Sequence, residues 1–181
     1  MAWHPVRQRL RARLSAAVAV AALASLPAMR SPAAAERTQR HGVVAAGIAV
    51  DVPAGMTAKV EAAAAPASGQ WLAQATLSVA GSELVRVEVY ANPRAQSAGG
   101  WVAAAWQELA RQTLLRPVEA GVPRWKGLRG DVAASPQSHA RTVVFIAAGE
   151  RLVHVACAVP NAVAQGHCNA VVAGLAKAGA P

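Results

Sequence analysis

The clearest hydrophobic pattern in the chain is a strict alternation over residues 84–90, where valine occupies every second position. Because successive side chains point to opposite faces of a β-strand, this pattern predicts a strand with one buried face. Looser alternation predicts further strands at 43–52, 71–79 and 127–134. Residues 58–69 fit either a short helix or a loop. These segments are therefore the expected strands of a β-sheet.

Two apolar segments near the end of the chain, 141–148 and 151–158, predict a hairpin joined by Gly149-Glu150. Glycine at the first turn position favours a two-residue type II′ turn, which fixes the residues that lie opposite each other. The predicted pairs are Thr142–Cys157, Val144–Val155, Ile146–Val153 and Ala148–Arg151 on one face, and Val143–Ala156, Phe145–His154 and Ala147–Leu152 on the other. Because both faces are largely apolar, we expect both to be covered.

Two segments repeat apolar residues with the period of an α-helix. The first spans 99–115 and ends before Pro117, which cannot continue a helix. The second follows Asn161, a favourable N-cap residue, and its apolar stripe consists of Cys168, Val171, Val172 and Leu175. The sequence therefore predicts an α+β domain. Its antiparallel β-sheet of about five to six strands should be covered by helices on both faces.

The N-terminal residues have the layout of a secretory signal peptide. Four arginines precede an uncharged, mostly apolar run from Leu14 to Leu26, and small residues follow. Cleavage after Ala28 or after Ala35 fits the small-residue rule, and we prefer Ala35. A retained membrane anchor is the alternative, but the apolar run is shorter than the roughly 20 residues of a spanning helix. We therefore expect a periplasmic or secreted protein.

The net charge of +9 does not alter the predicted fold or location. Residues 1–35 hold five of the 18 basic residues and none of the 9 acidic ones, and the remaining charges are scattered. A nucleic-acid partner is not expected, because it would require a clustered basic face. After the leader, we expect a disordered linker over 36–42 and a single α+β domain over 43–178.

The only two cysteines, Cys157 and Cys168, both lie in the part that is expected to be exported. An even number of cysteines in an oxidising compartment favours a disulfide. A metal site with His154 and His167 is the alternative, but structural zinc sites use cysteines that are closer together. A disulfide would hold the last helix against the final hairpin.

Two phrases of the chain resemble the PsbP-like domain family. They are residues 47–56 (GIAVDVPAGM), an apolar strand followed by a turn, and residues 152–160 (LVHVACAVP), which precede a helix. The resemblance implies an antiparallel sheet between helices, a PsbP-like α/β/α sandwich. It also implies a non-enzymatic role as an assembly factor, accessory subunit or adaptor, and it supplies no catalytic residues.

No motif in the sequence specifies a reaction, and no cofactor or metal is predicted. His154 faces Phe145 across the predicted hairpin, so we expect it in the core rather than as a base. The favoured function is that of an exported non-catalytic domain that binds a protein partner in the cell envelope, as an accessory or assembly factor. The first alternative is a small-ligand-binding module with a pocket near Trp71, Trp106 or Trp125. The second, less favoured, is a small hydrolase with a loop site around Asp131, His139 and Arg141.

Overall fold

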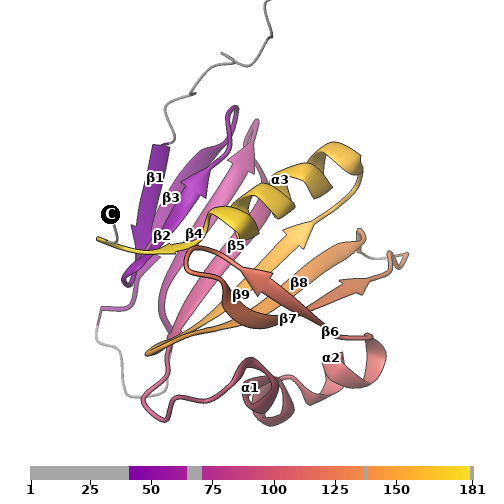
Figure 1. The fold of residues 1–181 in the computed structure, drawn as a ribbon. Helices are drawn as coiled ribbons and strands as arrows, with labels where there is room; N and C mark the ends of the chain where they lie inside the picture. Colours follow the sequence, from indigo (N-terminus) through magenta and orange to yellow (C-terminus); the bar gives the residue numbers. More distant parts are fainter. Residues whose placement is uncertain (1–40, 65–70, 137, 180–181) are drawn as a thin grey trace, which may run out of the picture. The chain divides into compact units, whose positions relative to one another are not determined.

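A computed structural model of the chain describes residues 41–64, 71–136 and 138–179. Its largest element is a seven-stranded antiparallel sheet with the strand order β3-β4-β5-β9-β8-β7-β6 (Figure 1). These strands are β3 (Thr57–Ala62), β4 (Trp71–Val79), β5 (Ser82–Ala91), β6 (Arg116–Ala120), β7 (Trp125–Val132), β8 (Arg141–Ala148) and β9 (Arg151–Ala158). A second sheet has the order β1-β2-β10 and consists of β1 (His41–Ala45), β2 (Ile48–Val52) and β10 (Ala176–Lys177).

The predicted sheet sandwiched between helices is wrong. Strands account for 52% of the described residues and helices for 21%, so the domain is mostly β. The three-stranded sheet and α3 (Ala162–Gly174) cover one face of the large sheet. The two short helices, α1 (Ala98–Ala105) and α2 (Gln107–Gln112), are the helical elements of the other face, where α1 packs on β7 and β8 (Figure 1). Polar side chains of β4 and β5 occupy much of the rest of that face, so it requires no apolar cover there.

The three-stranded sheet arises where the sequence predicted a single strand over 43–52. Ala46 and Gly47 have φ values of 46° and 85°, which fold this segment into the β1–β2 hairpin. A two-residue turn with positive φ at both positions matches the right-handed twist of the flanking strands. Ala80 and Gly81 join β4 to β5 in the same way, with φ values of 47° and 81°.

The predicted register of the final hairpin is confirmed at every pair, from Thr142–Cys157 to Ala148–Arg151. Gly149 has a φ of 64°, as a first turn residue of type II′ requires. This register gives the sheet two apolar faces at β8 and β9. One core lies against α3 and the three-stranded sheet, and the second core lies beneath α1 and consists of Ala98, Trp101, Val102, Val143, Phe145 and Leu152.

The two predicted helices have different outcomes. The stripe of α3 is confirmed, because its apolar residues are buried and the side chain of Asn161 accepts a hydrogen bond from the backbone N–H of Ala164. The predicted helix over 99–115 is instead interrupted at Trp106, whose φ and ψ are −128° and 32°. The interruption separates α1 from α2 and accompanies the packing of the Trp106 ring on Phe145.

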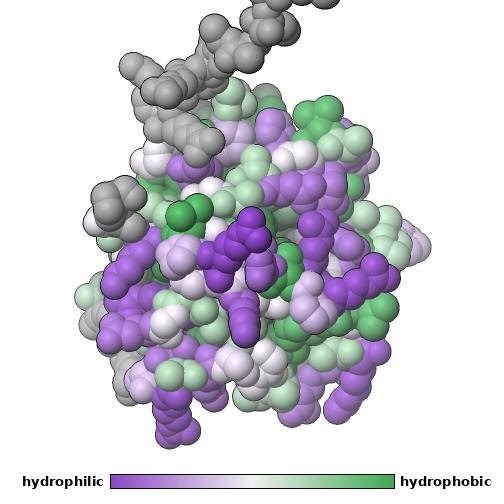
Figure 2. All heavy atoms as spheres, in the orientation of Figure 1, coloured by the Kyte–Doolittle hydropathy of each residue, from purple (hydrophilic) through white to green (hydrophobic). Residues whose placement is uncertain are grey.

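The expected signal peptide over 1–35 and residues 36–40 of the expected linker lie outside the described residues. The last two residues of that linker, His41 and Gly42, belong to β1. Within the described ranges, no helix combines the length and the apolar character that crossing a membrane requires. On the face of the molecule that Figure 2 displays, hydrophobic residues are scattered among hydrophilic ones.

Candidate functional site

The three residues proposed for a hydrolase do not form a common site. Asp131 lies opposite Thr142 on β7 and β8, whereas Arg141 is the neighbour of Thr142 along β8. Because adjacent strand residues point to opposite faces, the side chains of Asp131 and Arg141 lie on different sides of the sheet. His139 is exposed in the loop between these strands. Nothing in this arrangement supports general acid–base catalysis by the three.

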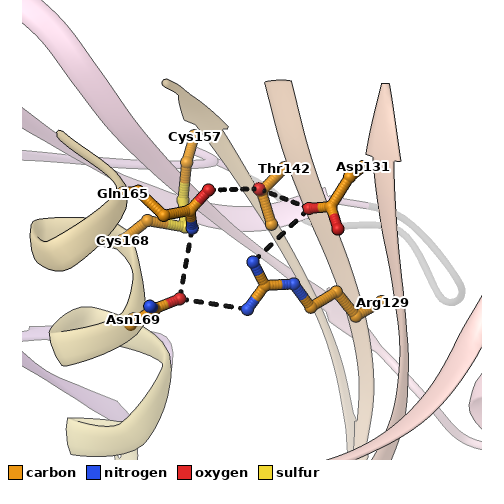
Figure 3. Close-up of a disulfide and its surroundings, with 7 residues drawn as sticks. All are labelled: Arg129, Asp131, Thr142, Cys157, Gln165, Cys168 and Asn169. Carbon is orange, nitrogen blue, oxygen red and sulfur yellow. Dashed lines mark hydrogen bonds and ion pairs between the residues drawn. A yellow bond between two sulfur atoms is a disulfide. The ribbon is translucent and has the colours of Figure 1, made fainter. Parts of the chain in front are cut away.

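The predicted disulfide is confirmed. Cys157 of β9 and Cys168 of α3 are both buried, their Cα atoms are 5.9 Å apart, and their sulfur atoms are bonded to each other (Figure 3). The alternative metal site is wrong, because neither sulfur is free to coordinate an ion. The bond attaches α3 to the face of the sheet that carries the larger core.

A chain of polar contacts lies beside the disulfide and links the sheet to α3 (Figure 3). Thr142 donates a hydrogen bond to Asp131 over 2.7 Å, and its hydroxyl is also 3.3 Å from Oε1 of Gln165. Gln165 and Arg129 both donate to Oδ1 of Asn169, over 3.2 and 3.0 Å. These contacts satisfy polar groups at the edge of the core and fix the position of the Arg129 guanidinium.

His154 is buried against the second core, as the sequence predicts, with an exposed fraction of 6%. Its ring stacks on Phe145 at 4.9 Å between centroids and lies 4.5 Å from the ring of Trp106. Nδ1 of His154 is 2.8 Å from Oε2 of Glu88, which holds the pKa of that carboxyl group below its usual value. Nε2 of His154 has no hydrogen-bond partner among the described residues. The aromatic rings thus cover the imidazole and keep it away from solvent.

Tyr90 offers a direct measurement of this environment, because it is the only tyrosine in the chain. Its hydroxyl donates to Glu88 over 3.2 Å, and burial together with the nearby carboxylate raises the pKa of Tyr90 to about 12. We expect phenolate absorbance at 295 nm to appear about two pH units later in the folded protein than in urea, where the usual pKa is about 10. Since the folded state retains this proton more tightly, stability should fall as the pH rises from about 10 toward 12. If Tyr90 titrated at the same pH in the folded protein and in urea, its hydroxyl would not be buried beside Glu88 as described.

A cavity of about 420 Å³ lies where several turns converge, and we call it the turn cavity. The β1–β2 turn, the loop before β7, the β8–β9 turn and the C-terminal strand each contribute to its wall. Its lining residues are Ala46, Gly47, Ile48, Pro123, Trp125, Ala148, Gly149, Glu150, Arg151, Lys177 and Ala178. Its volume lies in the range of about 300–1,000 Å³ that is common for ligand sites.

Hydrogen bonds attach the walls of the turn cavity to one another. Nε of Arg151 donates to the carbonyl of Ala46 over 3.0 Å, and the backbone N–H of Ala178 donates to the carbonyl of Gly47 over 2.9 Å. The backbone N–H of Val122 donates to the carbonyl of Leu175 over 2.7 Å. These bonds join turns that are far apart in the sequence, so they hold the walls of the cavity in fixed positions.

Close packing around Gly121 holds Trp125 in the wall of the cavity. Gly121 has a φ of 72°, and a Cβ atom there would approach the Trp125 ring to 2.8 Å and the carbonyl of Leu175 to 2.5 Å. Only glycine allows this approach at that backbone conformation. The half-buried indole therefore has a fixed orientation at the cavity.

The charged groups at the turn cavity are two cations and one anion. Arg151 uses Nε and Nη1 for backbone carbonyls, which leaves Nη2 without a hydrogen bond among the described residues. Lys177 is exposed, and within 41–64, 71–136 and 138–179 it forms no ion pair. Together with Glu150, these groups give the cavity a small positive excess, which favours an anionic group there.

No protein-family model matches the chain. No curated protein matches it either. The structure separates the three tryptophans that the sequence proposed for a pocket. Trp125 lines the turn cavity, Trp106 packs in the second core, and Trp71 lies opposite Tyr90 on neighbouring strands.

Sequence reasoning missed the two cations of the turn cavity. The predicted hairpin register already placed Arg151 beside the β8–β9 turn, which is a signal that could have been used. Lys177 offered no comparable signal. The strand β10 has only two residues, and its partner β2 is more than a hundred residues earlier in the sequence.

Proposed function

We propose that the protein is exported and acts outside the cytoplasm, in the periplasm or as a secreted protein, as a non-catalytic domain. Two observations support export. The first residues have the layout of a signal peptide, and the disulfide between Cys157 and Cys168 belongs to a bond type that persists mainly in oxidising compartments. As in the PsbP-like proteins that the chain resembles, the role would be that of an accessory or assembly factor for a protein partner in the cell envelope.

The turn cavity carries this proposal, because its residue types and rigidity suit a protein-binding hot spot. Tryptophan and arginine are enriched among the residues that dominate binding energy, and both Trp125 and Arg151 line the cavity. Turns on a rigid scaffold are also the usual place for binding residues. Val122, which is 64% exposed, precedes Pro123 in the cavity wall and adds apolar surface beside it.

The charges define the chemistry of the partner. Arg151 and Lys177 favour an acidic side chain, and the indole of Trp125 with Pro123 favours an adjacent apolar one. We therefore propose a partner segment that places an acidic residue next to an apolar anchor. The positive excess would mainly accelerate association, whereas the buried anchor would supply most of the affinity.

Charge reversal at Lys177 tests the site. Tagged protein is exported from its own signal sequence, crosslinked in intact cells and purified, and the amount of each crosslinked partner is compared between variants. We expect Lys177→Glu to reduce capture of the partner about tenfold or more, because it places an anion beside the acidic group of the partner. The β10 pairing uses only the backbone of Lys177, so the fold should persist, which circular dichroism would verify.

Lys126→Glu is the matched control, because Lys126 is also an exposed lysine close to Trp125 but does not line the turn cavity. It should retain full capture. Equal capture by the wild type and by Lys177→Glu would exclude the cavity as the binding site. Capture that both substitutions reduce equally would indicate a general charge effect, and it would also contradict the proposal.

A small organic anion is the second candidate, and the cavity volume of about 420 Å³ favours it. Purified protein without any partner distinguishes the two cases. A panel of aliphatic and aromatic carboxylates should change the tryptophan fluorescence of the wild type and of Lys126→Glu, but not that of Lys177→Glu. A response that survives Lys177→Glu would reject binding of the anion at this site.

A further inference from the structure

Two arginines lie directly opposite each other near the edge of the seven-stranded sheet. Arg116 of the edge strand β6 is the register partner of Arg129 on β7. Residues in such a pair project from the same face of the sheet, and their Cβ atoms are about 5 Å apart. Like charges at this separation destabilise a sheet unless an opposite charge lies between them. Negative charge beside the pair would therefore stabilise the sheet.

Asp131 supplies only part of that charge. Its Oδ1 lies 3.4 Å from Nη2 of Arg129, and the same oxygen accepts the shorter bond of 2.7 Å from Thr142. Asn169 of α3 holds Nη1 of Arg129 over 3.0 Å, and Figure 3 shows that this places the guanidinium between β7 and the helix. Arg116 forms no hydrogen bond or ion pair within the described ranges. One guanidinium is thus fixed in place and the other is available.

A cavity of about 320 Å³ accompanies the arginine pair. Its lining residues are Leu114, Arg116, Pro117, Val118, Arg129 and Asp131. Leu114 is 73% exposed, although leucine is a residue that folding normally buries. The cavity therefore places apolar side chains directly beside the two guanidinium groups, which suits a molecule with an anionic head and an apolar remainder.

We propose that Arg116 and Arg129 bind an oxyanion, the carboxylate or phosphate group of a small molecule. Each guanidinium presents N–H donors in a planar fork that matches the oxygen atoms of either group. Arg129 is the positioned donor, Arg116 closes on the anion from β6, and Leu114 with Val118 contacts its apolar part. This site is separate from the turn cavity and does not depend on the function proposed above.

Calorimetric titration of the whole exported domain with sodium phosphate and with sodium acetate, at constant ionic strength set by sodium chloride, tests the site. We expect Arg116→Gln to weaken binding of the preferred anion about tenfold or more, because charge-assisted hydrogen bonds contribute roughly 1.5–3 kcal/mol. The probe that binds more tightly to the wild type identifies the group. Arg116 is exposed and its removal relieves the repulsion from Arg129, so the substitution should not lower the thermal unfolding temperature in chloride.

Arg141→Gln is the matched control, because Arg141 is an exposed arginine of the same sheet and does not line this cavity. It should bind the anion as tightly as the wild type does. If Arg116→Gln keeps the affinity of the wild type, or if neither phosphate nor acetate binds measurably above the chloride background, the proposal is wrong. If both variants lose the same amount of affinity, the anion responds only to the net charge of the protein, and the proposal is also wrong.

Discussion

Replacing Phe145 by alanine is expected to lower the free energy of unfolding by about 3–5 kcal/mol, the largest single-residue effect that we predict for this domain. Phe145 is fully buried at the centre of the second core. Its ring lies 5.6 Å from that of Trp101, 5.2 Å from that of Trp106 and 4.9 Å from that of His154. Alanine would remove the group on which all three rings pack, and the short helices α1 and α2 could not refill the space.

Urea unfolding followed by tryptophan fluorescence measures this loss, and near-ultraviolet circular dichroism reports the order of the rings. Phe145→Leu is the control, because it keeps most of the apolar volume and should cost clearly less than the alanine variant. If alanine costs less than about 1 kcal/mol, far below the usual value for a buried aromatic residue, the second core is not packed as described. Loss of the near-ultraviolet signal should accompany loss of stability.

Reducing the disulfide is expected to lower the free energy of unfolding by about 3 kcal/mol. Cys157 and Cys168 are 11 residues apart in the sequence, and closing a loop of about this length restricts the unfolded chain by roughly that amount. Both cysteines are buried, so the reduced protein keeps its apolar contacts and loses mainly the covalent link. Urea unfolding of oxidised and fully reduced wild-type protein compares the two states with identical side chains.

The double variant Cys157→Ala with Cys168→Ala provides a second measurement. It should be at least as unstable as the reduced wild type, because it also loses the packing of both sulfur atoms. Its stability should not respond to reductant. A difference of less than about 1 kcal/mol between oxidised and reduced protein would mean that α3 stays on the sheet without the bond and that the link contributes little.

Local rules account for the parts of the fold that the sequence predicted correctly. The β8–β9 register follows from one turn glycine, Gly149, and from the period of a strand. The stripe of α3 and its N-cap at Asn161 follow from the period of a helix, and the disulfide follows because it joins two buried stripes. All of these features depend on residues that are close together in the chain.

Sequence reasoning missed features of two kinds. Some break the usual residue preferences of turns and helices, and others depend on residues that are distant in the sequence. The turn at Ala46-Gly47 places an alanine at positive φ, where asparagine or glycine is usual, so the β1–β2 hairpin looked like one strand. The break at Trp106 has no glycine or proline to mark it. As a result, the predicted helical cover was too long and the additional sheet was absent from the prediction.

The candidate sites were harder to predict than the fold. The turn cavity combines residues from four separate segments of the chain. Of the three tryptophans that the sequence proposed for a pocket, only Trp125 lines it. The arginine pair depends on the register of β6 with β7, which cannot be derived while the turn between them is unknown. Tryptophan is a residue type that is common in binding sites, so the sequence could suggest a pocket. Only the pairing of distant strands shows which charged side chains line the same cavity.

The strand β10 has a consequence for the order in which the chain can become native. Ala176 and Lys177 pair with Ala49 and Ile48, so residues near the C-terminus complete a sheet that the first hairpin began. As the chain is synthesised, the β1–β2 hairpin emerges before β10, so the edge of β2 that β10 occupies in the folded domain stays unpaired until then. Domains normally fold as units once their whole sequence is available. The three-stranded sheet is therefore completed only after Ala176 and Lys177 have emerged, long after its first two strands.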